Sequence, residues 1–404
     1  MARSIEVFAV EDTSAQLTWR GLNAGILLLE VEPASGTSAP AGAQGGATGA
    51  GPGARTGHPI WPGAKIEVTA GQPGAAVLDG LPSGSRLVIT ASGEPLDQPV
   101  RLDVTTLETL PGDELCRVAT INDLHLGAEA FGHRNSIVER PPPEVAHPLR
   151  CARAAIDAAT RWGAERLIVK GDITHHGQVE QWRDYAGLVA TSSIPVDALP
   201  GNHDRAFDPS QGLHPEEAAA VFGLSMASPV MVRDLPGLRM VLADSTTDHY
   251  NRGQVSRIAE PVLDAVNDAD PAGFVLVAIH HQLHRHLQAE GWPVGIGHWE
   301  SVRFLDALAA TGRRVMVTSG HTHRHRRWDR AGVTATQVGS TKDYPGVWAG
   351  YVVHEGGIRQ VVHRVDRPDC LAWTDQTRRA AFGAWRWVAP GTLQLRCFNR
   401  TWDT

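Results

Sequence analysis

The chain is poor in cysteine and has no long apolar run. Its four cysteines, Cys116, Cys151, Cys370 and Cys397, show no C-x-x-C spacing, which excludes a zinc ribbon. The sequence allows a disulfide between Cys370 and Cys397, although chains without an export signal more often keep their thiols reduced. No apolar run approaches the ~18 residues of a membrane span, and the first residues lack the layout of a signal peptide. We therefore expect a cytoplasmic protein that does not enter membranes.

An excess of basic residues is also absent. The net charge is -7, and no basic stripe is present to replace the counterions of a nucleic acid. The 42% hydrophobic and 20% charged residues are typical of a globular protein with ample core. A length of 404 residues predicts two or three domains. We expect no nucleic-acid partner, and the oligomeric state stays open, with a homodimer as one option.

Residues 1–110 differ in composition from the rest, since only His58 of the 19 histidines lies there. Short alternating stretches separated by Gly, Pro and Asp turns predict a small antiparallel β-sandwich. These stretches are Ile5–Val10, Ala15–Trp19, Gly25–Val31, Lys65–Val68, Arg86–Thr90 and Val100–Val104. Through Ala15–Trp19 and Leu81–Leu87 the region resembles fibronectin type III-like modules. Residues 34–58 are almost wholly Ala, Gly, Ser, Thr and Pro, which predicts a disordered loop.

Residues 113–365 alternate between strand-like and helix-like patterns, which predicts an α/β domain. The expected strands are Leu115–Ile121, Arg166–Lys170, Pro195–Leu199, Leu238–Ala243, Phe274–Ile279 and Arg314–Thr318. The expected helices are Pro148–Trp162, Val179–Ala190, Pro261–Val266 and Ser301–Ala310. Three later strands, Thr334–Val338, Ala349–His354 and Ile358–His363, are expected to form a closing meander.

Five polar islands follow these strands, and each contains side chains that bind metals. They are Asp123-Leu124-His125, Gly171-Asp172, Gly201-Asn202-His203-Asp204, His280-His281 and Gly320-His321-Thr322-His323. Open α/β sheets bind ligands at the carboxyl ends of their strands, so we expect the islands to converge. Carboxylates and imidazoles suit Zn, Mn, Fe or Co, and two such ions about 3.5–4 Å apart clamp a transferring phosphoryl group. The pattern therefore predicts a two-metal phosphoesterase.

The order D-x-H, G-D, G-N-H-D, H and G-H-x-H resembles the signature of calcineurin-like metallophosphoesterases over residues 123–323. The resemblance implies a four-layer α/β/β/α sandwich and two divalent or mixed-valence ions, whose identity as Mn, Fe or Zn stays open. It assigns the first ion to Asp123, His125, Asp172 and His323. It assigns the second ion to Asp172, Asn202, His280 and His321. It also makes His203 the catalytic acid facing the substrate, oriented by Asp204.

The same resemblance implies hydrolysis of a small phosphodiester by a metal-bridging hydroxide, as in the class III cyclic nucleotide and glycerophosphodiester enzymes. A phosphomonoesterase or nucleotidase is the alternative, because the metal ligands are common to both. A non-catalytic scaffold is a more distant alternative, since such relatives usually lose His203 or several ligands. The expected partner is a small-molecule phosphoester.

Three positions leave a choice between roles. Only one of His280 and His281 can face the metal, because a strand alternates its faces, and the resemblance favours His280. His175 stands where purple acid phosphatases have a metal-binding Tyr and many phosphodiesterases have Asp, so it is either an extra ligand or a hydrogen-bond partner of a ligand. The tail, residues 366–404, is either a packing cap or an aromatic lid over the substrate. It carries Trp373, Trp385, Trp387 and Trp402.

Overall fold

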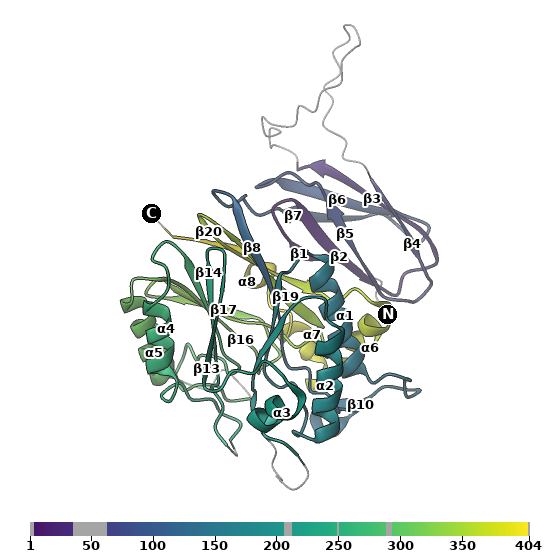
Figure 1. Cartoon of the computed structure of the whole chain (residues 1–404). Helices are drawn as coiled ribbons and strands as arrows, with labels where there is room; N and C mark the ends of the chain where they lie inside the picture. Colours follow the sequence, from purple (N-terminus) through teal and green to yellow (C-terminus); the bar gives the residue numbers. More distant parts are fainter. Residues whose placement is uncertain (1–3, 35–62, 206–211, 249, 288–292, 403–404) are drawn as a thin grey trace. The chain divides into compact units, whose positions relative to one another are not determined.

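The structure, a computed structural model, describes residues 4–34, 63–205, 212–248, 250–287 and 293–402 (Figure 1). The predicted disordered loop, apart from Ala34, lies outside the described residues. The chain divides into two compact units, Met1–Thr109 and Leu110–Thr404. All four cysteines are free and buried, so the Cys370–Cys397 disulfide is not formed. Among the described helices, none is long and apolar enough to cross a membrane.

The first unit is built from two antiparallel sheets, as the alternating stretches predict. One sheet has the order β1-β2-β5 and the other β4-β3-β6-β7. The strands are β1 (Ser4–Val10), β2 (Ser14–Arg20), β3 (Gly25–Pro33), β4 (Ala64–Val68), β5 (Gly74–Asp79), β6 (Arg86–Gly93) and β7 (Val100–Thr105). The expectation of an all-β first region is confirmed, but β5 was not predicted. Its Gly-Ala-Ala start has no polar–apolar alternation that would indicate a strand.

The second unit contains two six-stranded sheets. The first sheet has the order β12-β11-β8-β19-β20-β21, and the second has the order β13-β14-β15-β16-β18-β17. The first comprises β8 (Glu114–Ile121), β11 (Arg166–Lys170), β12 (Val196–Leu199), β19 (Val347–His354), β20 (Gly357–Arg364) and β21 (Phe398–Thr401). The second comprises β13 (Val230–Leu235), β14 (Leu238–Ala243), β15 (Phe274–Ala278), β16 (Arg314–Ser319), β17 (Arg326–Arg330) and β18 (Val333–Gln337). A short hairpin, β9 (Ala130–Phe131) and β10 (Ile137–Val138), follows β8.

The predicted closing meander is wrong in one strand. β19 and β20 do form an antiparallel hairpin in the first sheet, but β18 lies in the second sheet. There β18 pairs parallel with β16 and antiparallel with β17. The sequence of β17, Arg-Arg-Trp-Asp-Arg, is too polar to predict a strand, so its pairing with β18 could not be foreseen.

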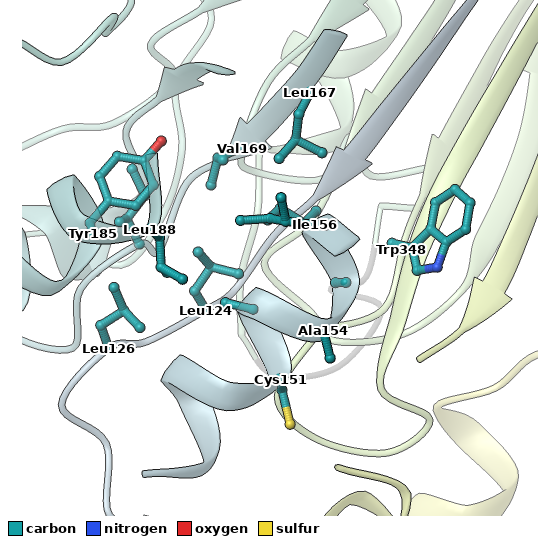
Figure 2. Close-up of a cluster of buried hydrophobic side chains, with 14 of the residues drawn as sticks. Leu124, Leu126, Cys151, Ala154, Ile156, Leu167, Val169, Tyr185, Leu188 and Trp348 are labelled. Carbon is teal, nitrogen blue, oxygen red and sulfur yellow. The ribbon is translucent and has the colours of Figure 1, made fainter. Parts of the chain in front are cut away.

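Helices cover the outer face of each sheet. On the first sheet these are α1 (His147–Arg161), α2 (Val179–Thr191), α3 (Pro215–Phe222) and α6 (Pro368–Thr377). On the second sheet they are α4 (Ala259–Asn267) and α5 (His298–Ala310). Figure 2 shows Ile156 of α1 and Leu188 of α2 in one buried cluster with Leu167 and Val169 of β11. Burial of apolar surface on these outer faces holds the helices to the sheets.

The inner faces of the two sheets pack against each other. Met240, Leu276 and Met316 of the second sheet are fully buried although they alternate with the residues that face the helices. Polar bonds also join the sheets: Lys170 Nζ donates to Thr318 Oγ1 at 2.9 Å, and Thr318 Oγ1 lies 2.8 Å from the Tyr351 hydroxyl. The result is a helix, sheet, sheet, helix arrangement, which confirms the predicted four-layer α/β/β/α architecture.

Truncation of the first sheet's core should destabilise the second unit strongly. Leu167 is fully buried, so Leu167→Ala should cost about 2–5 kcal/mol of unfolding free energy through lost burial and a cavity. Urea unfolding followed by tryptophan fluorescence reports on this unit, because ten of the twelve tryptophans lie in it. As a matched control, Val221→Ala on α3 removes a side chain that is 64% exposed and should change stability by less than ~0.5 kcal/mol. Equal midpoints for the two variants would contradict this packing.

Candidate metal centre

The five predicted islands converge at the carboxyl ends of strands from both sheets. In the first sheet, β8 leads to Asp123 and His125, β11 to Asp172, and β12 to Asn202. In the second sheet, β15 leads to His280 and β16 to His321 and His323. Neighbouring strands within each of these groups are parallel. Because parallel strands end at the same edge, each sheet delivers its ligands to one place.

The backbone at these ligands is held in an unusual conformation. Five of the seven predicted metal ligands have a positive φ: Asp123 (54°), His125 (46°), Asp172 (49°), His321 (71°) and His323 (55°). Each such residue costs of order 1–3 kcal/mol and persists only where its surroundings fix it. The loops fix one another, since His125 N donates to Asp172 O at 2.8 Å and Gly320 N donates to His280 O at 2.9 Å. Strain concentrated at the ligands is typical of a functional site.

Apolar neighbours anchor the same loop. Leu124 and Leu126 alternate with the ligands Asp123 and His125, and each is 1% exposed. Figure 2 shows both leucines within the hydrophobic cluster under α1 and α2. Their burial turns the two ligands away from that core and toward the centre.

Two glycines of the islands are required by close backbone approach. A Cβ on Gly201 would lie 2.3 Å from the Asp172 Oδ1 atom, and a Cβ on Gly171 would lie 2.7 Å from His280 Nδ1. Both distances are shorter than any side chain tolerates. The glycines of the G-D and G-N-H-D islands therefore let the two loops pack directly against a ligand.

The carboxylate of Asp172 lies between two groups of donor atoms. Its Oδ2 atom is 3.5 Å from His125 Nε2, and its Oδ1 atom is 3.3 Å from His280 Nε2. Asp172 is 2% exposed. A buried carboxylate with one oxygen on each side has the geometry of a ligand shared by two ions.

The first donor group consists of Asp123, His125, Asp172 and His323. His125 Nε2 is 3.3 Å from His323 Nε2, and His323 Nε2 is 3.5 Å from Asp123 Oδ1. Ligands at 2.0–2.2 Å from one ion are about 3.0–3.5 Å apart, so these atoms could surround one cation. The residues present therefore fit a first metal ion.

The second donor group consists of Asp172, Asn202, His280 and His321. His280 Nε2 is 3.1 Å from His321 Nδ1, and His280 Nδ1 lies 2.8 Å from Lys170 O. Donation from Nδ1 to that carbonyl leaves Nε2 for the metal. The Oδ1 atom of Asn202 is buried and has no hydrogen-bond partner among the described residues. An orphaned buried acceptor is costly unless a cation satisfies it, so this group fits a second metal ion.

The choice between His280 and His281 follows from their partners. His280 faces Asp172, whereas His281 Nδ1 lies 2.9 Å from Ser245 Oγ. The two rings are 4.9 Å apart and nearly perpendicular, at 83°. The structure brings His280, and not His281, to the shared carboxylate.

His203 is held with one ring nitrogen occupied and the other available. Its backbone N donates to Asp172 Oδ1 at 2.9 Å, and its Nδ1 lies 3.0 Å from His175 O. Donation from Nδ1 to the carbonyl leaves Nε2 as the nitrogen that can act on a substrate. The ring centroid is 4.7 Å from that of the ligand His125, which places it beside the first donor group.

Asp204 acts on the loop and not on the imidazole. Its carboxylate accepts from Gly201 N at 2.8 Å and from Thr174 N and Oγ1 at 2.7 and 2.9 Å. The expected orientation of His203 by Asp204 would therefore act through the backbone of this loop, because the hydrogen-bond partner of the ring itself is His175 O. Asp204 instead fixes the turn that carries Asn202 and His203.

His175 stands beside the nitrogen of His125 that points away from the first donor group. Its Nδ1 is 3.5 Å from His125 Nδ1, while His125 Nε2 faces His323. Ring nitrogens of His125, His175 and His203 lie within 4.8 Å of one another. This placement favours a hydrogen-bond partner of the ligand over an extra ligand on the same ion.

Several residues at the centre were not predicted. Asp343 Oδ2 lies 2.5 Å from His323 Nδ1 and thereby fixes the ring so that Nε2 faces the first group. Trp385 Nε1 donates to the other oxygen of Asp343 at 3.3 Å. The Phe131 ring packs near both aromatic groups, with its centroid 6.2 Å from that of His323 and 5.7 Å from that of Trp385. No motif marks Asp343, since it stands twenty residues beyond its histidine.

The tryptophans of the tail differ in their surroundings. Trp373 is fully buried, stacks on His147 at 3.8 Å and donates to Lys342 O at 2.7 Å, so it packs a cap. Trp385 reaches the metal centre through Asp343, whereas Trp387 is 72% exposed. Trp373 therefore supports the packing role, and Trp385 is the tail residue that the described contacts connect to the metal centre.

Buried charges at the centre separate its histidines into two classes, because burial lowers the pKa of His125 and His321 well below the usual value while neighbouring carboxylates raise the pKa of His280 and His323. Burial opposes the charged imidazole, but Asp172 outweighs it and raises the pKa of His280 to about 9. Asp343 and Asp123 likewise outweigh burial and raise the pKa of His323. Despite burial, His280 and His203 hold the pKa of Asp172 well below its usual range. The site is thus a carboxylate stabilised by protonated imidazoles until cations replace the protons.

Metal binding should release protons near neutral pH. His280, with its pKa raised to about 9, is protonated at pH 7 and must lose that proton to become a ligand. Calorimetry of Zn or Mn binding in buffers of different ionisation enthalpy should therefore detect on the order of one or more protons released per protein. Apparent affinity should rise as pH increases toward 9. Two results together would contradict this picture: binding heats that do not depend on the buffer, and a metal affinity that does not change between pH 6 and pH 9.

The chain is similar in sequence and in fold to known phosphoesterases. The chain is 26% identical over 163 residues to a probable glycerophosphodiester phosphodiesterase, GpdQ, from Arcobacter nitrofigilis, covering 39% of this chain and 56% of that protein. It therefore spans little more than half the length of this curated relative. A similar solved structure is the purple acid phosphatase PPD1 of yellow lupin (11% identity, TM-score 0.45, 93% of this chain and 76% of that chain). Another is PhoD (9% identity, TM-score 0.41, 90% of each chain).

A sequence profile decides the family. The profile described as calcineurin-like phosphoesterase matches residues 116–325. The match covers slightly more than half of the chain and includes all five islands, from Asp123 to His323. The chain belongs to the calcineurin-like phosphoesterase family.

Proposed function

We propose that this protein is a two-metal phosphodiesterase that hydrolyses a small phosphodiester of the glycerophosphodiester or cyclic nucleotide type. The observation that carries the proposal is the position of Asp172, whose two oxygens face two separate donor groups. Two clustered cations are the usual arrangement for phosphoester hydrolysis. The name of the GpdQ relative, a probable glycerophosphodiester phosphodiesterase, supports a diester over a monoester.

The donor sets determine the charge available to a substrate. Asp123 and Asp172 contribute two negative charges, and the other proposed ligands, the imidazoles and Asn202, are neutral when they coordinate. Two divalent ions bound there would leave an excess of positive charge, attract the phosphate anion and lower the pKa of a coordinated water toward neutrality. Burial of both carboxylates keeps bulk water from screening this attraction.

His203 is the proposed general acid. With Nδ1 directed at His175 O, a proton on Nε2 is available for the leaving oxygen. Asp204 keeps this loop in place through Gly201 and Thr174, so its contribution is to position His203. A pre-oriented acid needs no reorganisation when the ester bond breaks.

A substrate panel tests the function. Purified protein loaded with Mn should hydrolyse the diester bis-p-nitrophenyl phosphate faster than the monoester p-nitrophenyl phosphate. Cyclic AMP and a glycerophosphodiester are tested in the same panel. Asp172→Asn is the control, because removing the shared charge should abolish turnover of every ester. Preference for the monoester would favour the phosphomonoesterase alternative. No turnover of any ester by fully loaded protein would favour a scaffold.

Loss of His203 should affect catalysis more than metal binding. His203→Ala should lower kcat by roughly 10²–10⁴-fold, the range for a positioned acid, with metal content near wild type. An alkyl leaving group needs the proton more than nitrophenolate does, so the alkyl ester should lose more activity. Rates on both esters, together with metal analysis, check this. Equal losses on the two esters would remove the acid role, and loss of one metal equivalent would make the residue structural.

A further inference from the structure

Lys342 is a buried cation beside the metal centre that neither the sequence motifs nor the proposed mechanism uses. It lies in the loop between β18 and β19 and is only 4% exposed. The chain contains 37 basic residues, of which only Lys65, Lys170 and Lys342 are lysine. Two of these three lysines are buried next to the candidate metal centre. In a chain whose basic residues are almost all arginine, a buried lysine at this position points to a specific role for its ammonium group.

The loop that carries Lys342 is fastened to the ligand loop. Ser340 Oγ donates to Asp123 O at 3.0 Å, and Thr341 N donates to Asn122 O at 3.2 Å. The lysine's own backbone is fixed at both ends, since its N donates to Ser340 Oγ at 3.1 Å and its O accepts from Trp373 Nε1 at 2.7 Å. The position of the side chain relative to the centre is therefore well determined by the fold.

The ammonium group points toward the first donor group. Its Nζ lies 5.0 Å from the centroid of the Phe131 ring, and that ring stacks against His323 at 6.2 Å. Phe131 is only partly buried, so this edge of the centre is reachable. After burial, the positive charge is one of the causes that lower the pKa of His125 and His175, and it opposes the rise in the pKa of His323.

The ammonium lacks a counterion of its own. Among the described residues, Lys342 Nζ makes no hydrogen bond or ion pair, and it lies over the face of the Phe131 ring. The nearest carboxylates are engaged: Asp343 binds His323 and Trp385, while Asp123 and Asp172 belong to the donor groups. A buried charge without a partner is costly. An anion bound next to the ammonium would offset this unfavourable free energy of burial.

We infer that Lys342 is an anion-binding residue of this centre, whose ammonium takes an anionic oxygen of the substrate's phosphoryl group. The inference rests on the proposed function and adds a third positive group to the two ions. Lys342 contributes three N–H donors, so it can follow a phosphoryl oxygen as the geometry changes. The Phe131 face stabilises the charge when the substrate is absent.

The test measures binding of inorganic phosphate to the Zn-loaded full-length protein. Lys342→Met should weaken phosphate binding about 10- to 100-fold, the value of a charge-assisted hydrogen bond, with two metal equivalents retained. Lys342→Arg should recover part of the affinity, because the charge is kept. Lys65→Met removes the same charge from an exposed strand of the first unit and is the matched control, with affinity as in wild type. Phosphate affinity within twofold of wild type in Lys342→Met would overturn the inference.

A second measurement uses unaltered protein and does not depend on the stability of the methionine variant. With three lysines in the chain, labelling lysine Nζ with ¹⁵N gives at most three signals, and Lys342→Arg identifies the one of interest. Phosphate should shift the Lys342 signal and leave Lys65 unchanged. A Lys342 signal that does not respond to saturating phosphate would overturn the inference. Failure of the proposed function would look different, since the wild-type protein would then bind phosphate without hydrolysing diesters.

Discussion

The centre depends on a buried carboxylate, Asp172, whose two oxygens face different groups of imidazoles. Its charge cannot be left uncompensated at 2% exposure. In the metal-free protein the compensation comes from protonated His280 and from the backbone N of His203. In the proposed two-metal state, the same two oxygens would be ligands of the ions. The fold of the surrounding loops can be understood as the scaffold that keeps this one carboxylate central.

That scaffold is built from mutual hydrogen bonds and strained backbone. The ligand loops after β8 and β11 exchange backbone bonds, and the loop carrying Asp343 is tied to Asp123 by Ser340. Left-handed conformations at five ligands store free energy that a flexible loop would release. Rigid placement of this kind is what two-metal catalysis requires, because ligands must already lie within the bonding distance of both ions. The two sheets thereby deliver a preformed site and not one assembled by the substrate.

The sequence predicted the layers and the convergence of the five islands because both depend on local patterns. Strands buried on two faces read as apolar runs, and five strands were followed by a short polar island such as Gly171-Asp172. The charged strand β17 and the weakly alternating β5 were missed, since tertiary pairing and not local composition makes them strands. The second layer of the site was missed for the same reason. Asp343, Lys342 and Phe131 reach the centre only through the fold, whereas Trp385 was named in advance only as one of four tryptophans of the tail.

The direction of the Asp204 side chain also could not be predicted from the sequence. Its place next to His203 in the sequence suggested direct contact, but the turn directs its carboxylate to Gly201 and Thr174. The His203 ring finds its partner in the carbonyl of His175. Adjacency in sequence identified both residues, while the direction of each side chain required the three-dimensional structure.

The central claim is that Asp172 bridges two ions. A crystal of the Mn-loaded protein, measured at the manganese absorption edge, tests this most directly. We expect two anomalous peaks about 3.5–4 Å apart. One ion should be bonded to Asp172 Oδ2, His125 and His323. The other should be bonded to Asp172 Oδ1, Asn202 and His280. A single fully occupied peak, with both oxygens of Asp172 on one ion and Asn202 turned away, would contradict it.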